Sequence, residues 1–285
     1  MRLGRIPYNV VSWNYNIFFS MKTRLVSYAT PEYENSLSVL SVTAKHFGID
    51  EVFAFRRNDL VNTDFYKQNR KLLDVPRGGG FWLWKPYYIH EVLQQINDGD
   101  ILVYSDAGIF ILDDLSPLYK ICLRNGGILL FHAHYDDIGT PGKNVNSRWT
   151  KRDAFVLMRC DSAEYHNARQ VDGSFQVYLK NERSLQFARE YLDYCCNPAI
   201  LANGANICGL GNLPDFIQHR EDQSVLSLLA VKHKLEMFRH PSQFGNHLKV
   251  PALRVPDERL RKPYSNQPYM NSPYPMLIFQ HRSRT

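Results

Sequence analysis

The 285-residue sequence has few cysteines, and nothing in their spacing indicates a use for them. The five are odd in number and unevenly spaced, with no Cys-x-x-Cys pair: Cys122, Cys160, Cys195, Cys196 and Cys208. An odd, irregular set argues against a disulfide framework, and the missing pair argues against a thiolate zinc site. We therefore expect a reducing compartment, and a cytoplasmic location.

Long apolar runs are also missing. Residues 1–20 hold only short apolar pieces, Val10-Val11 and Ile17 to Phe19, which asparagines interrupt. A spanning helix needs about 20 predominantly apolar residues, and a signal peptide needs an apolar core of its own. We predict neither, and we interpret residues 1–21 as an N-terminal extension, with Met1 or Met21 as the start.

Basic residues are numerous but scattered. Lysine and arginine total 34 against 28 aspartates and glutamates, a net charge of +6, yet no five of them stand together. The excess suits an anionic ligand, whereas the scatter disfavours a nucleic-acid-binding tail. We therefore expect no nucleic-acid partner.

Three familiar enzyme motifs do not occur. The chain has no Gly-Lys-Ser/Thr phosphate loop, no Gly-x-Gly-x-x-Gly after its first predicted strand and no Gly-x-Ser-x-Gly elbow. These absences weaken the cases for a phosphate-loop nucleotidase, a dinucleotide-dependent dehydrogenase and a serine hydrolase.

The sequence does contain alternating strand and helix patterns. Strands are predicted over 23–30, 51–55, 101–104 and 127–132, and helices over 34–47, 64–73, 87–96, 182–195 and 223–234. A strand, a helix and a strand over 23–55 indicate a right-handed βαβ unit. We predict one α/β, Rossmann-like domain over 22–250, with a mainly parallel central sheet flanked by helices. Residues 251–285, rich in proline, form an irregular C-terminal segment.

The first chemical signal is an aspartate directly after a buried strand, in Ile101-Leu-Val-Tyr-Ser-Asp106-Ala-Gly108. Ligands of open α/β sheets bind at the carboxyl ends of the strands. A carboxylate there can hold a divalent cation that neutralises a diphosphate. The alternative is an aspartate that caps the following turn.

The second signal is Gly78-Gly-Gly-Phe-Trp-Leu-Trp-Lys85-Pro86. Glycines let a backbone approach a ligand closely, tryptophans offer stacking planes, and Lys85 offers a charge for a phosphate. A glycine-rich turn beside core tryptophans explains the same pattern equally well.

The remaining signals are weaker. Glu221 and Asp222 open a predicted helix, where capping and the helix dipole favour acidic residues, and where a carboxylate can also act as a general base. The stretch from Arg148 to Asp153 can bind a sugar or an anion, or form a solvated turn. Four histidines are candidates for a metal or phosphate contact: His132, His134, His240 and His281.

Taken in this order, the motifs resemble nucleotide-sugar-dependent glycosyltransferases of the GT-A fold, like the polysaccharide-associated transferases of bacteria and large viruses. The resemblance covers most of Lys22 to Arg282 and is most specific from Gly78 to Gly108. It implies a hexosyl- or pentosyltransferase with a nucleoside diphosphate sugar such as a UDP-sugar as donor, and a glycan or glycoconjugate hydroxyl as acceptor. It also implies a C-terminal segment that closes over the active site.

The resemblance further implies roles for single residues. Asp222, with Glu221, would be the catalytic base or orient the acceptor. Acceptor contacts would come from Trp149 and Arg152. Donor contacts would come from Tyr28, Ala29, Thr30, Arg56, Trp84, Lys85, Ser105 and Asp106.

One departure concerns the metal. GT-A enzymes carry Asp-X-Asp, whereas this chain has Asp106-Ala107-Gly108. Mn²⁺ or Mg²⁺ would then be held by Asp106 with His281, or with His240 as a substitute. Alternatively, the positive charges of Lys85, Arg56 and Arg57 would replace part of the charge that the cation supplies.

The incomplete motif also leaves open a catalytically inactive carbohydrate- or nucleotide-binding protein. A sugar nucleotidyltransferase is a further alternative, with Asp113 and Asp114 as the nearest second carboxylates.

Overall fold

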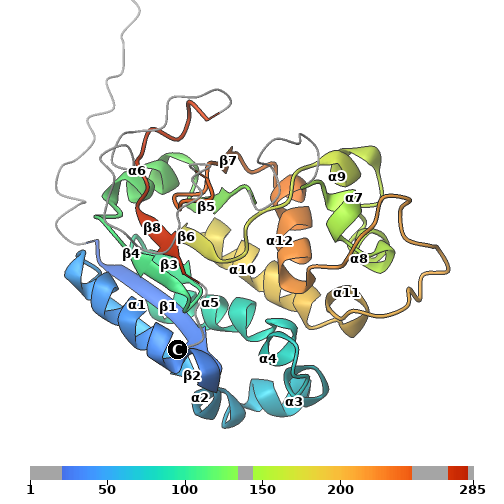
Figure 1. The fold of residues 1–285 in the computed structure, drawn as a ribbon, viewed down its shortest axis with the longest axis horizontal. Helices are drawn as coiled ribbons and strands as arrows, with labels where there is room; N and C mark the ends of the chain where they lie inside the picture. Colours follow the sequence, from blue (N-terminus) through green and yellow to red (C-terminus); the bar gives the residue numbers. More distant parts are fainter. Residues whose placement is uncertain (1–20, 134–143, 246–268, 282–285) are drawn as a thin grey trace, which may run out of the picture.

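The computed structural model describes residues 21–133, 144–245 and 269–281, and it confirms a mixed α/β architecture (Figure 1). The strands are β1 Thr23–Ala29, β2 Glu51–Arg56, β3 Ile101–Ser105, β4 Ile109–Ile111, β5 Ile128–Phe131, β6 Phe175–Leu179, β7 Met237–Phe238 and β8 Ile278–Gln280. The helices are α1 Glu34–His46, α2 Arg57–Val61, α3 Asp64–Leu73, α4 Gly78–Phe81, α5 Trp84–Gln95, α6 Ser116–Arg124, α7 Asn146–Trp149, α8 Arg152–Leu157, α9 Ala163–Asn167, α10 Glu182–Cys195, α11 Pro198–Leu201 and α12 Glu221–Lys232, with a 3-10 turn, Pro31–Tyr33, before α1.

The central sheet has six strands in the order β2-β1-β3-β6-β5-β7. Strand β1 runs parallel to β2 and β3, and β5 runs parallel to β7, whereas β6 is antiparallel to both of its neighbours. The predicted mainly parallel sheet is therefore confirmed. Because Thr23 pairs with Ile101, β1 and β3 end at the same edge of the sheet.

Helices cover both faces of this sheet, which explains the nearly continuous apolar run of β3. Leu102 and Tyr104 pack into a core with α5, α10 and α12. Ile101 and Val103 point the other way, into a core with α1 and α6. In Figure 1, α1 lies on one side of the sheet and α5, α10 and α12 lie on the other. The sheet edge at which β1 and β3 end is thus packed against helices on both faces.

The described part of the C-terminal segment is not wholly irregular. Residues Ile278–Gln280 form β8, which pairs antiparallel with β4 directly after β3. This pairing returns the end of the chain to the edge where β3 ends. The boundaries at 21/22 and 250/251 stay predictions, since residues 1–20 and 246–268 lie outside the described ranges. No helix within those ranges combines the length and the apolar character needed to cross a membrane.

Candidate active site

A cavity of about 910 Å³ lies at the carboxyl edge of β1 and β3. Its wall is built from distant parts of the chain: Tyr28, Thr30, Glu32 and Tyr33, several residues between Pro76 and Lys85, Asp106 to Ile109, Gly173 and Ser174, several residues between Gln218 and Gln223, and Gln280. This is the edge at which open α/β sheets bind ligands. Its volume lies in the usual range for small-molecule sites, roughly 300–1,000 Å³.

Lys85, from the first turn of α5, joins two carboxylates at this cavity. Its Nζ lies 2.8 Å from Oδ2 of Asp222 and 3.7 Å from Oδ1 of Asp106. It also donates a hydrogen bond of 3.0 Å to the carbonyl of Gly173. Only 3% of Lys85 is exposed. The ammonium would therefore act on a ligand mainly through the combined electric field of Lys85, Asp106 and Asp222.

Lys85, Asp106 and Asp222 shift one another's pKa values. Burial alone would lower the pKa of Lys85, but attraction by Asp106 and Asp222 outweighs it and raises that pKa, so the ammonium stays charged. Burial raises the pKa of Asp222 above its usual range, although Lys85 and the Tyr191 hydroxyl act against the rise. The Tyr191 hydroxyl donates to Oδ2 of Asp222 at 3.0 Å. Asp222 is therefore a more basic carboxylate than a surface aspartate.

Asp106 is held in place by its neighbours, although its side chain is 36% exposed. Its backbone N–H donates to the carbonyl of Ser174 at 2.8 Å, and the Tyr104 hydroxyl donates to its Oδ1. Burial raises the pKa of Asp106, while Lys85 and Tyr104 lower it. Its carboxylate thus faces the cavity in a fixed orientation.

The glycine motif is a left-handed turn. All five residues from Gly78 to Trp82 have positive φ, between 53° and 107°. A Cβ on Gly80 would lie 2.6 Å from Cα of Leu73, and one on Gly79 would lie 2.7 Å from Thr30. The amides of Gly79 and Gly80 bond within the turn. These glycines are therefore explained by the turn itself, which places the tryptophans.

The second tryptophan of this motif forms part of the cavity wall. Trp84 stacks on Tyr28 with ring centroids 4.3 Å apart, and its indole N–H donates to the carbonyl of Gly78 at 2.9 Å. Across the cavity, Arg77 pairs with Glu221 at 2.5 Å, and Asn203 donates to the same carboxylate. Glu221 has a positive φ of 45° at the start of α12. The ion pair therefore ties the glycine turn to the helix that carries Asp222.

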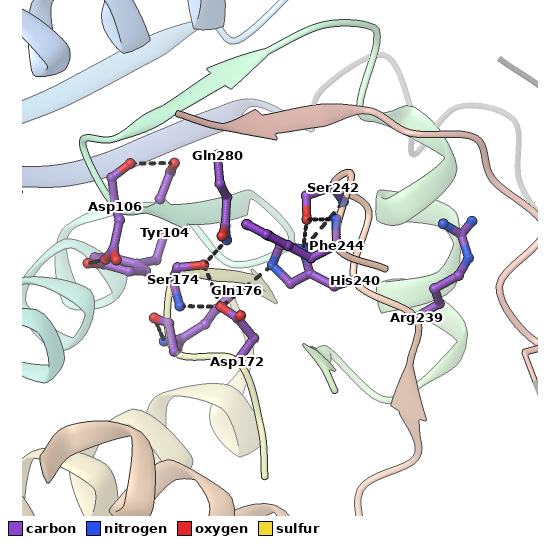
Figure 2. Close-up of polar contacts among 12 residues, drawn as sticks. Tyr104, Asp106, Asp172, Ser174, Gln176, Arg239, His240, Ser242, Phe244 and Gln280 are labelled. Carbon is purple, nitrogen blue, oxygen red and sulfur yellow. Dashed lines mark hydrogen bonds and ion pairs between the residues drawn. The ribbon is translucent and has the colours of Figure 1, made fainter. Parts of the chain in front are cut away.

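A chain of polar contacts lies behind Asp106 (Figure 2). The Gln280 side-chain amide donates to Oγ of Ser174, whose hydroxyl donates to Oδ1 of Asp172. His240 lies on the far side of Asp172, with Nε2 3.6 Å from the same oxygen. The C-terminal strand is thereby connected to the loop before β6.

Seven of the predicted site residues come together in the cavity wall: Tyr28, Thr30, Trp84, Lys85, Asp106, Glu221 and Asp222. Ala29 and Ser105 are buried in their strands and do not line it. Arg56 is exposed at the end of β2, with its Nε 3.7 Å from Glu34. The roles assigned to these residues stay predictions.

The two predicted acceptor residues do not line the cavity either. Trp149 packs under the guanidinium of Arg220, which lies 3.9 Å from the ring centroid and does line the cavity. Arg152 pairs with Asp161 at 2.9 Å. A contact of Trp149 or Arg152 with an acceptor therefore stays a prediction.

The predicted metal ligands are divided between two places. The ring of His281 stacks on Phe110, and its backbone N–H donates to Gly108. His240 is buried beside Asp172. In the described ranges, no three His, Cys, Asp or Glu side chains are grouped to hold a metal ion. Mn²⁺ or Mg²⁺ at Asp106, with His281 or His240, therefore stays a prediction.

Sequence patterns missed several residues that line the cavity, among them Arg77, Ser174 and Gln280. Ser174 directly precedes β6, and a strand pattern was visible in Phe-Gln-Val-Tyr-Leu at 175–179, which would have marked the loop before it. Nothing in the sequence pairs Gln280 with Ser174.

No protein-family model and no curated protein matches the chain. Among solved structures, it is similar to the galactosyltransferase LgtC in complex with donor and acceptor sugar analogues, at 11% identity and a TM-score of 0.48, over 92% of this chain and 87% of that one. The glycosyltransferase GlyE of Streptococcus pneumoniae TIGR4, apo form, has 12% identity and a TM-score of 0.44, over 92% of this chain and 55% of that one. Mouse xyloside xylosyltransferase 1, apo form, has 11% identity and a TM-score of 0.44, over 92% and 98%. Each of these three structures is of a glycosyltransferase.

Proposed function

We propose that the protein transfers a sugar from a nucleoside diphosphate sugar to a hydroxyl of a glycan acceptor in this cavity. One observation carries the proposal. The carboxylates of Asp106 and Asp222 lie 3.7 Å and 2.8 Å from the Lys85 ammonium, beside a cavity large enough for a sugar nucleotide.

The cavity wall suits a polyhydroxylated ligand. Carboxylates accept hydrogen bonds from hydroxyl groups, and aromatic faces pack on the apolar face of a ring. Glu32, Asp106 and Asp222 supply carboxylates, while Trp82 and Trp84 supply rings. This combination favours a sugar over a purely apolar molecule.

Asp222 is the residue that would act on the acceptor. Tyr191 and Lys85 both contact its Oδ2, so the other oxygen is left to face an acceptor hydroxyl. A carboxylate with a raised pKa takes up a proton more readily as that hydroxyl attacks the anomeric carbon. In a retaining reaction the same oxygen would orient the acceptor instead.

Positive charge beside the cavity would stabilise the departing diphosphate. Lys85 contributes an ammonium, and Arg77 and Arg220 contribute guanidinium groups to the wall. Fixed cations act most strongly where negative charge grows during the reaction.

Binding and turnover together test the proposal. Thermal unfolding of the protein is followed with UDP-, GDP- and dTDP-sugars and with the free diphosphates, each with and without Mn²⁺. Release of nucleoside diphosphate is measured in parallel, with the sugar passing to water or to an added glycan. A ligand at one hundred times its Kd stabilises the folded state by about 2.7 kcal/mol, which is a readable shift. Binding with release of diphosphate is the expected result. Binding without release would favour the inactive binding protein, and no binding would overturn the proposal.

A further inference from the structure

One polar atom at the cavity wall has no role in the proposed reaction. Gln280 lines the cavity and is 5% exposed. Its Nε2 donates to Oγ of Ser174, but its Oε1 is buried and has no hydrogen-bond partner among the described residues (Figure 2). Buried amide oxygens nearly always have a partner in folded proteins. A bound ligand can supply that partner here.

The orientation of the Gln280 amide follows from where the protons are. Asp172 is 2% exposed and accepts the backbone N–H of Ser174 at 2.8 Å as well as the Ser174 hydroxyl. The Ser174 hydroxyl proton belongs to its contact with Oδ1 of Asp172. Oγ of Ser174 can then only accept from Gln280. The amide nitrogen must face Ser174, and the carbonyl oxygen must face away from it.

The backbone of Gln280 is fixed as well. Its N–H donates to Oε1 of Gln243 at 3.1 Å, and its carbonyl accepts from Nε2 of the same glutamine at 2.8 Å. Gln280 also pairs with Ile109 in the β4–β8 sheet. Since the carbonyl of Ser174 accepts the backbone N–H of Asp106, the Gln280 amide belongs to the Asp106 side of the cavity.

We propose that Oε1 of Gln280 accepts a hydrogen bond from a hydroxyl of the sugar carried by the nucleotide donor. The inference rests on the proposed function and assigns a donor-specificity residue to it. The diphosphate has only acceptor oxygens at neutral pH and gives nothing to a carbonyl oxygen, whereas a sugar hydroxyl gives a proton. A site built to bond a hydroxyl discriminates strongly against ligands that lack it. The diphosphate is thereby excluded as the partner of Oε1. The ribose hydroxyls and base N–H groups of the nucleotide can also donate, and the free nucleoside diphosphates of the test separate them from the sugar.

The test compares each sugar nucleotide with the free nucleoside diphosphate of the same base. Dissociation constants are measured by calorimetry for UDP-glucose, UDP-galactose, GDP-mannose and dTDP-rhamnose, and for free UDP, GDP and dTDP. The proteins are the wild type, Gln280→Met, and Gln94→Met, which makes the same change on the exposed face of α5. Gln280→Met should bind the sugar nucleotide about tenfold more weakly and bind the free diphosphate unchanged. Gln94→Met should match the wild type for both.

A second variant guards against disturbed folding at the buried position. Ser174→Ala leaves Gln280 intact but removes the oxygen that orients its amide, so it should weaken the sugar nucleotide and spare the free diphosphate. An equal loss for both ligands would indicate a structural role and overturn the inference. Equal affinity of Gln280→Met and wild type for the sugar nucleotide would overturn the inference about Gln280, while the proposed function would stand. If the wild type binds none of the four sugar nucleotides, the proposed function fails and the inference fails with it.

Discussion

His219 should make the protein less stable in mild acid, because the fold needs its ring neutral. The backbone N–H of Lys151 donates to Nδ1 at 3.2 Å, and Nε2 lies 2.9 Å from the carbonyl of Ile200. Nδ1 must therefore accept and Nε2 must carry the proton. Burial, together with the positive charges of Lys151 and Arg77, lowers the pKa of His219 to about 3. The residue lies two positions before the first residue of α12, so protonation would disturb the start of the helix that carries Asp222.

The size of the effect follows from the difference between the two states. In the unfolded chain the histidine has its ordinary pKa of 6.5, against about 3 in the folded protein. Above pH 6.5 neither state holds the proton, and His219 has no effect on the pH dependence. Below pH 6.5 His219 binds a proton in the unfolded state but not in the folded state. The free energy of unfolding therefore falls by about 1.4 kcal/mol for each pH unit. The loss at pH 5 is about 2 kcal/mol, and it continues to grow down to the folded pKa.

Urea unfolding at pH 7.5 and pH 5.0 measures this loss. In His219→Asn, a neutral side-chain oxygen can still accept the Lys151 N–H, so the variant should lose about 2 kcal/mol less than the wild type between the two pH values. The control is His46→Asn, at an exposed position on α1, which should follow the wild type. His132, whose pKa burial also lowers to about 3, contributes equally to all three proteins and cancels. An identical pH dependence in His219→Asn and wild type would refute the reasoning.

Two further changes test the packing around the cavity. Lys85→Met leaves two carboxylates beside the cavity without their buried cation and should lower the free energy of unfolding by about 3–5 kcal/mol; a urea midpoint equal to that of the wild type would contradict the central place given to this ion. Gly80→Ala places a Cβ 2.6 Å from Cα of Leu73 at a φ of +107° and should cost about 3 kcal/mol or more. The control is Gly99→Ala, at a φ of +88° with no atom within 4 Å of the added Cβ, which should cost only about 1–2 kcal/mol. Both losses are measured by urea unfolding, and equal losses would show that close packing at Gly80 does not matter.

The elements that sequence predicts best are those with a complete local signal. The helix over 182–195 is confirmed at both ends, since its apolar spacing continues for several turns and Asn181 caps it. The helix over 64–73 is confirmed in the same way, with Thr63 as the cap. Strand β6 and helix α6 were not predicted, because they are only five and nine residues long, although β6 carries an alternating apolar pattern and α6 begins with Ser116-Pro117.

The site shows the same division. Asp106 follows a strand and Asp222 opens a helix, so position alone made both candidates, and the structure places them around one ammonium. The partners of Lys85 could not be predicted, because Gly173 lies 88 residues away. The contact between Ser174 and Gln280 spans 106 residues and depends on β8 pairing with β4. Tertiary pairing of this kind leaves no periodic mark in a sequence.

Release of nucleoside diphosphate by Asp222→Asn is the most direct test of the proposed transfer. The variant is compared with the wild type and with Asp98→Asn, the same change at an exposed position in the turn before β3. Removing a general base typically slows a reaction by about 10²–10⁴-fold. Wild type and Asp98→Asn should release diphosphate from the same sugar nucleotide at equal rates, and Asp222→Asn should be slower by at least about 100-fold while still binding that donor. Undiminished release by Asp222→Asn would contradict the assignment of this cavity as the site of sugar transfer.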